Sequence, residues 1–341
     1  MLKKFLLLLA AFIIIFILVY PLNKPAQNPS DRQLRLAYFP NITHAQALIG
    51  TSDGTFQKSL GSGVTLETKV FNAGPEEIEA LLAGAIDIGY VGPSPAINGF
   101  IKSQGSALRI ISGSASGGAS LVLSQKYADE FQKIGPAALA GAKIASPQHG
   151  NTQDVSLRNY LGVNGLEGKA TILPVANADQ LTTLARGDID GAWAPEPWAT
   201  RLVTEAGAVR VIDERTLWPG AKFATTEIVV RTDYLKQNPD LVEKFLQAQQ
   251  EVTAWLTENP ETARAMINTE IKKLTSKQLT DSVLTEAWAK LDFTTDPLKE
   301  SVNSFADQAY SQKLLGDTKP DLANLFDLTI HDRLTDPPTK P

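Results

Sequence analysis

The chain has 341 residues, 43% of them hydrophobic and 20% charged, which is a normal globular composition and enough length for two ordinary domains. The formal net charge is -5 and no basic run follows the N-terminus, so nucleic acid is not expected as a partner. Because cysteine is absent, disulfides, thiol catalysis, cysteine-ligated zinc and a lipid-modified cysteine are excluded. The three histidines, His44, His149 and His331, argue against a histidine-rich metal site, and we expect no metal and no other cofactor.

The N-terminus has the pattern of an export signal. Two lysines precede Phe5–Val19, a run of uncharged apolar residues, which is typical of a secretory signal. No clean cleavage site follows, and the apolar segment 5–22 approaches the ~17 residues that begin to span a bilayer. Residues 1–22 are therefore predicted to be a cleaved signal peptide or a retained membrane anchor, followed by a polar linker over residues 23–33. Either alternative predicts a periplasmic or other extracytoplasmic location.

The first predicted strand, Leu34–Phe39, is followed by a polar helix start. Thr43 is predicted to cap a helix that ends at about Thr51. Asn41, Thr43 and His44 would then lie where free N–H groups and partial positive charge attract anions. The alternative is that Thr43 only caps the helix and His44 only faces solvent.

The next segment continues the alternation of strands and helices. Val64–Phe71 is a predicted strand, and Gly74 and Pro75 open a predicted helix over Glu76–Ala83. The pattern of strand, helix, strand, helix and strand predicts a largely parallel sheet.

One sequence pattern occurs twice, in Leu81–Pro95 and in Thr183–Pro197. Each copy has the end of an apolar helix, a glycine, an Ile-Asp pair, a short strand and a Pro-X-Pro corner. Gly84 and Gly187 suit the left-handed position that ends a helix. The repeat favours two similar α/β lobes, with corners at the carboxyl ends of strands, where open sheets bind ligands. Chance resemblance is the alternative. The predicted strands are Ile86–Val91 and Ile189–Ala194.

Small and polar residues lie at the end of the first copy and after it. Ser94 would lie at a helix start aimed at the same sheet edge. The strand Leu108–Gly113 is followed by Ser114–Gly118, small residues that either let a ligand approach the backbone or form a hinge. Neither a dinucleotide-binding glycine motif nor a P-loop occurs.

The second half repeats the arrangement. Ser146–Gln153 follows a predicted strand, and Asn151 or Thr152 is predicted to cap a helix that ends at about Leu161. Phe223–Arg231 is predicted to be the strand that returns to the first lobe. The other predicted elements are the strands Ala119–Ser124, Ala142–Ala145, Ala170–Pro174 and Arg210–Asp213 and the helix Asn177–Ala185.

The chain is predicted to be helical from Asp233 onward. Trp255 and Trp288 lie in apolar stripes at helical spacing and are predicted to be core residues. Residues 331–341 are predicted to be a loose tail. The predicted helix starts are Asn238-Pro239, Asn259-Pro260, Ser276 and Asp296-Pro297.

Five segments carry a family resemblance: YFPNITHAQAL, DIGYVGPSPAING, SPQHGNTQDVSLRNYL, WAPEPWATRLV and LWPGAKFATTEIVVR. Together they resemble the solute-binding component of bacterial ABC importers, in the nitrate/sulfonate/taurine group, which shares its fold with thiamine-precursor binders. The resemblance covers about Leu34 to Lys290. It implies a type II two-lobe α/β fold with two crossings and a cleft between the lobes. It also implies a monomer without catalytic activity that delivers its ligand to an ABC permease in the membrane.

The resemblance also implies domain boundaries and site residues. Lobe I would comprise residues 34–118 and 223–330, and lobe II residues 119–222. The implied ligand-binding residues are Asn41, Thr43, His44, Ser94, Ser116, Gly117, Gly150, Asn151, Thr152, Glu196, Trp198 and Thr225.

These residues predict capture of a small anion by helix N-termini, hydroxyls and amides, without a salt bridge. An aliphatic sulfonate, with or without an amino group such as taurine carries, is the ligand we expect. Glu196 would pair with such an ammonium group or, as we favour, bond backbone at the corner. Trp198 would form a wall for the ligand or pack under the corner, and His149 would complement the anion or face solvent.

Other ligands and roles remain open at this point. Nitrate, an aromatic sulfonate and a thiamine-precursor pyrimidine are alternatives. A pyrimidine would stack on aromatic residues, for which Tyr90, Trp193 and Trp198 are the candidates. A ligand-sensing domain without transport is a further alternative.

Overall fold

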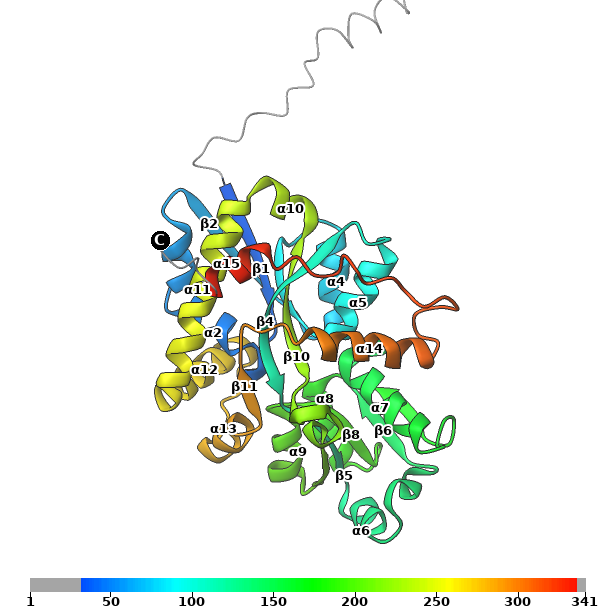
Figure 1. Cartoon of the computed structure of the whole chain (residues 1–341). Helices are drawn as coiled ribbons and strands as arrows, with labels where there is room; N and C mark the ends of the chain where they lie inside the picture. Colours follow the sequence, from blue (N-terminus) through cyan, green and yellow to red (C-terminus); the bar gives the residue numbers. More distant parts are fainter. Residues whose placement is uncertain (1–31, 336–341) are drawn as a thin grey trace, which may run out of the picture.

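The computed structural model describes residues 32–335. The predicted signal peptide or anchor over residues 1–22, the linker up to residue 31 and residues 336–341 of the predicted tail lie outside the described residues. Two β-sheets, each covered by helices on both faces, form an upper and a lower lobe (Figure 1). Within residues 32–335, no helix is both long enough and apolar enough to cross a membrane.

Lobe I is built on a six-stranded sheet in the order β11-β4-β10-β3-β1-β2. Strand β1 is parallel to β2 and β3, whereas β10 is antiparallel to both β3 and β4. The predicted parallel sheet is therefore wrong for half of the lobe, and the sheet is mixed. The strands are β1 (Arg32–Tyr38), β2 (Val64–Val70), β3 (Ile88–Val91), β4 (Leu108–Gly117), β10 (Ala224–Arg231) and β11 (Leu291–Phe293).

Lobe II has a five-stranded sheet in the order β7-β6-β8-β5-β9. It repeats the mixed pattern, because β6 is parallel to β7 and β8 while β5 is antiparallel to β8 and β9. The strands are β5 (Ala119–Leu123), β6 (Lys143–Ser146), β7 (Thr171–Pro174), β8 (Gly191–Pro195) and β9 (Val209–Asp213).

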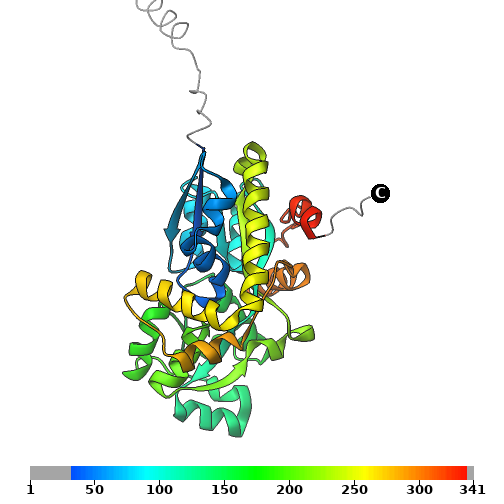
Figure 2. The same cartoon turned by 90° about the vertical axis from the view of Figure 1, so that its left-hand side faces the viewer.

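Helices cover both faces of each sheet. In lobe I, Phe56, Phe245 and Tyr90 lie in the core on one face, and Phe100 and Phe305 in the core on the other. Figure 2 shows the long helix α11 running along the side of lobe I. The helices of lobe I before the first crossing are α2 (Ala45–Ser52), α3 (Thr55–Leu60), α4 (Gly74–Leu82) and α5 (Pro93–Lys102). Those of lobe II are α6 (Gln125–Ile134), α7 (Thr152–Val163), α8 (Asn177–Ala185) and α9 (Trp198–Ala206).

The two lobes are joined by two crossings, from β4 to β5 and from β9 to β10, as the family resemblance implies. The first crossing is made by Gly117 and Gly118, whose φ angles are +78° and +71°. A side chain at Gly117 would also meet the Arg215 guanidinium at 2.2 Å, and one at Gly118 would meet Leu291 at 2.3 Å. Glycine is required at both positions by backbone conformation and by space.

The predicted end of strand β4 at Gly113 is wrong, because the strand continues to Gly117. Ser114, Ala115, Ser116 and Gly117 are part of this strand, in which Ser116 pairs with Ala224 of β10 and Asp292 of β11. The lack of large side chains lets the two neighbouring strands and the crossing approach closely, so these residues serve packing between strands.

The C-terminal helices lie against lobe II as well as lobe I. Helix α14 contacts α7 and helix α13 contacts α9 (Figure 1). Ion pairs join β11 and its approach to lobe II, with Arg215 and Asp292 at 3.0 Å and Lys290 and Asp213 at 3.2 Å. The helices are α10 (Thr232–Gln237), α11 (Pro239–Glu258), α12 (Pro260–Thr275), α13 (Asp281–Trp288), α14 (Lys299–Ser311) and α15 (Thr329–Thr335).

Several predicted boundaries are wrong for local reasons. Thr43 does not cap α2, since it lies inside a 3-10 turn over Ile42–His44 and His44 precedes the helix. Ser276 ends α12 in a left-handed conformation, and Thr280 caps α13 through its hydroxyl. Residues 331–335, expected in a loose tail, belong to α15.

Candidate functional site

A small cavity of about 40 Å³ lies between the two lobes. At about 10–15 Å³ for each water-sized occupant, it has room for roughly three or four such occupants. Lobe I and lobe II both line it. The lining residues are Phe39, Asn41, Thr43, His44, Asn72, Ala73, Gly74, Gly92, Pro95, Pro147, Asn151, Thr152, Gln153, Asn177, Pro195, Thr225 and Thr226.

Four helices begin at this cavity. Gly74 begins α4 and Gly92 precedes α5 in lobe I, whereas Thr152 begins α7 and Asn177 begins α8 in lobe II. The free N–H groups and the positive dipole end of a helix favour an anion by ~0.3–1 kcal/mol when exposed and up to ~2 kcal/mol when partly buried. Four N-termini around one cavity therefore create a site for negative charge that needs no cationic side chain.

Two amide side chains at the cavity have their oxygens occupied. Asn151 caps α7, and its Oδ1 accepts from the Asp154 backbone N–H at 2.8 Å, as the sequence predicts for a cap at this position. Asn41 Oδ1 accepts from the indole N–H of Trp198 at 2.8 Å, across the two lobes. With both oxygens engaged, the amide nitrogens of Asn41 and Asn151 remain to donate to a ligand.

His44 lines the cavity as a neutral side chain. Its Nδ1 accepts from the Phe39 backbone N–H at 3.2 Å, so in the neutral ring the proton lies on Nε2. Complete burial lowers the pKa of His44 from 6.5 to about 3. At neutral pH His44 can therefore donate one hydrogen bond but adds no positive charge.

Three buried polar atoms at the cavity have no hydrogen-bond partner among the described residues. They are the hydroxyl of Thr226 from lobe I and, from lobe II, the hydroxyl of Thr152 and Oδ1 of Asn177. These residues are 1%, 3% and 9% exposed, respectively. Because a buried polar group without a partner costs ~1–3 kcal/mol, three such groups facing one cavity favour a polar ligand there.

The structure brings together six of the predicted site residues. Asn41, Thr43 and His44 come from the turn after β1, Asn151 and Thr152 from the start of α7, and Thr225 from β10. The Thr225 hydroxyl donates to the Gly117 carbonyl, which fixes the strand end beside the first crossing.

The other six predicted residues do not line the cavity. Ser94 is buried one residue from the lining residue Pro95, and its hydroxyl has no partner. Ser116 accepts from the Phe223 backbone N–H, and the backbone N–H of Gly150 donates to Asp154 at 3.0 Å. The remaining residues away from the lining are Gly117, Glu196 and Trp198.

Glu196 has local partners at the second corner. It accepts from the Thr200 backbone N–H at 3.0 Å, and Arg210 lies 2.9 Å from its other oxygen. Burial raises the pKa of Glu196 above its usual value, although Arg210 and Thr200 act in the opposite direction. This arrangement supports the structural role that we favour for Glu196.

Two of the aromatic residues considered for stacking on a ligand lie in the protein cores and not at the cavity. Tyr90 and Trp193 are fully buried in the cores of lobe I and lobe II, and their polar atoms bond Gln249 and Glu214. Neither lines the cavity. His149 is exposed and lies beside Asp154 at 3.5 Å, so it faces solvent at the edge of the loop.

Sequence reasoning missed lining residues of three kinds. Asn72 and Gly74 flank Ala73, the N-cap of α4, which has no polar side chain, so the capping rule that identified Asn151 does not find them; the predicted opening of this helix at Gly74 is the available signal. Asn177 is the first residue of a helix whose bounds were predicted correctly, so its place at a helix start was a usable signal of a ligand-binding role. Thr226 lies within a strand and could be found only once the register of that strand with its neighbours, and so the side of the sheet that carries the Thr226 side chain, was known.

The sequence matches a known family over most of its length. Residues 27–271 match the NMT1-like family. A Brucella abortus (strain 2308) protein named as a binding protein, BAB2_1146, is 26% identical over 215 residues, which is 62% of this chain and 63% of that protein. The chain therefore spans less than two thirds of the length of this relative.

Two further relatives have names that include a ligand. The taurine-binding periplasmic protein of Escherichia coli (strain K12) is 28% identical over 203 residues, 58% of this chain and 59% of that protein. A Bacillus subtilis (strain 168) protein named for binding aliphatic sulfonates is 24% identical over 288 residues, 83% of this chain and 82% of that protein.

Solved structures share the fold. The alkanesulfonate-binding protein SsuA from Xanthomonas axonopodis pv. citri, bound to MOPS, has a TM-score of 0.67 at 19% identity, covering 85% of this chain and 96% of SsuA. The periplasmic nitrate-binding protein NrtA from Synechocystis PCC 6803 has a TM-score of 0.71 at 16% identity, covering 91% of this chain and 89% of NrtA. The predicted two-lobe binding-protein fold and the resemblance to the nitrate/sulfonate/taurine group are confirmed.

Proposed function

The chain belongs to the NMT1-like family, and from that premise we propose that it is the solute-binding component of an ABC importer. It captures a small organic anion, an aliphatic sulfonate, in the cavity between its lobes and delivers it to a membrane permease from the periplasm or another extracytoplasmic space. It binds its ligand without catalysis, in keeping with relatives that are named as binding proteins.

The observation that carries this proposal is the donor-rich character of the cavity. Four helix N-termini meet there, and the amide nitrogens of Asn41 and Asn151 and Nε2 of His44 are left to donate. A sulfonate group has three acceptor oxygens and a single negative charge, so it suits many neutral donors arranged around a small space.

The distribution of the donors between the lobes supports capture by lobe closure. Asn41, His44 and Thr226 belong to lobe I, and Asn151, Thr152 and Asn177 to lobe II. A ligand that bonds both sets joins the lobes and is shielded from water, which strengthens each contact.

Nitrate is the second candidate ligand, and the size of the cavity favours it. A cavity of about 40 Å³ admits a compact anion of a few heavy atoms or the head group of a sulfonate. A pyrimidine gains less support, because Tyr90 and Trp193 lie in the two cores.

A thermal-shift screen of the purified protein tests the proposal. The panel holds alkanesulfonates, taurine, nitrate, sulfate and thiamine-pathway pyrimidines. A ligand at about one hundred times its dissociation constant stabilises by ~2.7 kcal/mol, a shift of several degrees. A shift with sulfonates supports the proposal, a shift with nitrate alone supports the second candidate, and no shift with any anion contradicts both.

A matched pair of variants then tests the site. Thr226→Val removes a buried hydroxyl at the cavity, and we expect the affinity to fall roughly 10–150-fold, the equivalent of ~1.5–3 kcal/mol for a hydrogen bond to a charged group. Thr171→Val makes the same change at an exposed position of β7 and should leave affinity unchanged.

A further inference from the structure

We propose that the cavity selects anions whose tail carries no positive charge, so that it binds an alkanesulfonate and rejects the corresponding amino-alkanesulfonate. This inference rests on the proposed function and narrows its ligand class. It follows from the chemistry of the side chains that line the cavity. It also follows from the buried carboxyl groups of nearby elements, none of which lines the cavity.

The described residues that line the cavity include no carboxylate, ammonium or guanidinium group. Their polar side chains are amides, hydroxyls and one neutral imidazole. An anion is served by these donors and by the four helix N-termini. An ammonium group would find neutral acceptors, such as Asn177 Oδ1, but no counter-charge.

One candidate for a counter-charge, Glu196, follows the lining residue Pro195 and is already engaged. Its carboxylate lies 2.9 Å from Arg210 and accepts from the Thr200 backbone N–H. Asp154, in the first turn of α7, is engaged in the same way by Arg158 at 2.9 Å and by the backbone N–H of Gly150 at 3.0 Å. Neither carboxylate lines the cavity.

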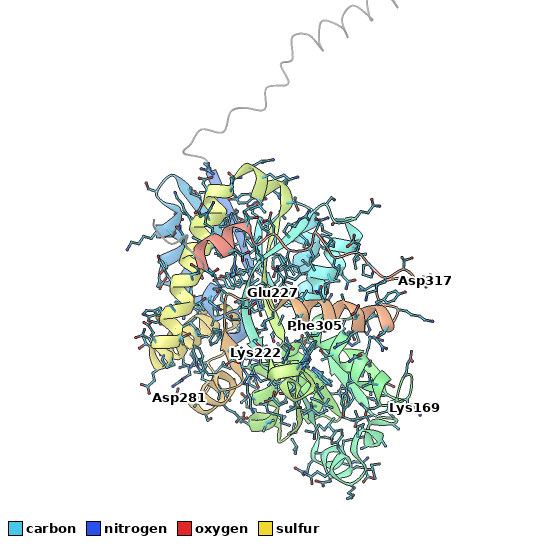
Figure 3. The ribbon with its side chains drawn as sticks, in the orientation of Figure 1. Lys169, Lys222, Glu227, Asp281, Phe305 and Asp317 are labelled. Atoms are coloured by element: carbon cyan, nitrogen blue, oxygen red, sulfur yellow. The ribbon has the colours of Figure 1, made fainter. Side chains whose placement is uncertain are left out.

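Two further acidic residues of lobe I, Glu77 and Glu227, are buried but do not line the cavity. Glu77 lies in the first turn of α4 with its carboxyl against Gly89, where an added side-chain carbon would meet it at 2.1 Å. Glu227, which Figure 3 shows near the centre of the molecule, pairs with Val91 and Gly113 within the sheet. Burial raises the pKa of both groups well above the usual value, which disfavours the ionised carboxylate that an ammonium group would need as a partner.

The consequence for a zwitterionic ligand is a charge without compensation. A cavity of about 40 Å³ holds the sulfonate head group, so the ammonium group, joined to it by a short carbon chain, is kept close to the same helix ends. Any hydration that it loses there is not offset without an ionised partner. The positive ends of four helices add repulsion to the same group. The sulfonate end gains from the cavity in both ligands, so the ammonium group alone distinguishes them.

The test compares 1-propanesulfonate with taurine, which has an ammonium group in place of the terminal methyl group. Calorimetric titrations of the full-length protein at pH 7.5 give both dissociation constants. We expect 1-propanesulfonate to bind at least one hundred times more tightly than taurine. Equal or tighter binding of taurine overturns this inference and leaves the proposed function standing, whereas binding of neither sulfonate overturns both.

A gain-of-function variant sharpens the test. Asn177→Asp places a carboxylate at the start of α8, where a negative charge suits the helix. The ratio of affinities should move at least tenfold toward taurine. Asn159→Asp adds the same charge to α7 away from the cavity lining and should leave the ratio unchanged. An unchanged ratio in Asn177→Asp, or an equal shift in Asn159→Asp, contradicts the inference.

Discussion

Gly92 provides a direct test of lobe closure. It precedes α5 in lobe I with φ of -68° and ψ of 156°, a conformation that alanine adopts without strain. A Cβ atom at this position would lie 2.3 Å from the hydroxyl oxygen of Thr152 and 3.4 Å from its Cβ in lobe II. The substitution Gly92→Ala therefore leaves lobe I undisturbed and meets its obstacle only across the cavity.

The magnitude follows from the contact distance. A separation of 2.3 Å is more than 1 Å short of ordinary van der Waals contact, so the Thr152 side chain must rotate or the lobes must stay further apart. Overpacking of this kind costs about 1–3 kcal/mol. If that cost falls on the closed arrangement, the ligand affinity drops by about 5–150-fold, since about 1.4 kcal/mol corresponds to a factor of ten.

Isothermal titration with the tightest sulfonate of the screen measures the effect. The melting temperature of the ligand-free variant should stay close to that of the wild type, while the dissociation constant rises. Thr152→Ala removes the obstructing oxygen, so the double variant should bind more tightly than the sum of the two single effects predicts. Unchanged affinity in Gly92→Ala, or a double variant with purely additive losses, would refute the close approach of Gly92 and Thr152.

Three predictions concern buried ionisable groups. The pKa of His44 is 6.5 in the unfolded chain and about 3 in the folded protein, so its contribution to stability is present above pH 6.5 and is lost as the pH falls. Between pH 8 and 5.5, the free energy of unfolding measured in urea should fall by about 1.4 kcal/mol less in His44→Asn than in the wild type. An unchanged pH dependence contradicts the assignment. Burial raises the pKa of Glu214 from 4.5 to about 7, so its contribution is complete below pH 4.5 and is lost as the pH rises through 7. The free energy of unfolding of Glu214→Gln, relative to that of the wild type, should therefore rise by about 3 kcal/mol between pH 4.5 and 8. A difference that does not change with pH would contradict this. Arg210→Met should lower the free energy of unfolding by about 3–5 kcal/mol, because it leaves Glu196 buried without its counter-charge, and a loss below 1 kcal/mol would show that Glu196 is compensated elsewhere.

Local chemistry made part of the fold predictable from the sequence. Gly84 and Gly187 have φ angles of +70° and +76°, as expected of glycines that end a helix. The helix Asn177–Ala185 was predicted with its bounds, and Asn151 caps α7 through its side chain. In each case the signal lies within a few residues of the feature that it specifies.

Features set by distant parts of the chain were not predictable in this way. The lobe I sheet is mixed because β10 returns from lobe II between β3 and β4 in the opposite direction. The lobe II sheet is mixed because β5 lies between β8 and β9 and is antiparallel to both, and no local pattern encodes either insertion. Helix α6 was missed because it buries only Ala128 and lies largely in solvent. Only part of the cavity lining was predictable, since helix starts carry a sequence signal, whereas the direction in which the Thr226 side chain points depends on strand pairing.

Among residues 32–335, no charged side chain lines the cavity, and under the proposed function this has a further consequence for ligand release. A salt bridge formed by one lobe would hold an anion even when the lobes are apart. Here each helix N-terminus contributes at most ~2 kcal/mol, and two of the four belong to each lobe. Separation of the lobes therefore removes about half of the interactions and returns water to the other half, which weakens them. Affinity then depends on the lobe arrangement itself, so a permease that separates the lobes can release the ligand without competing for it chemically.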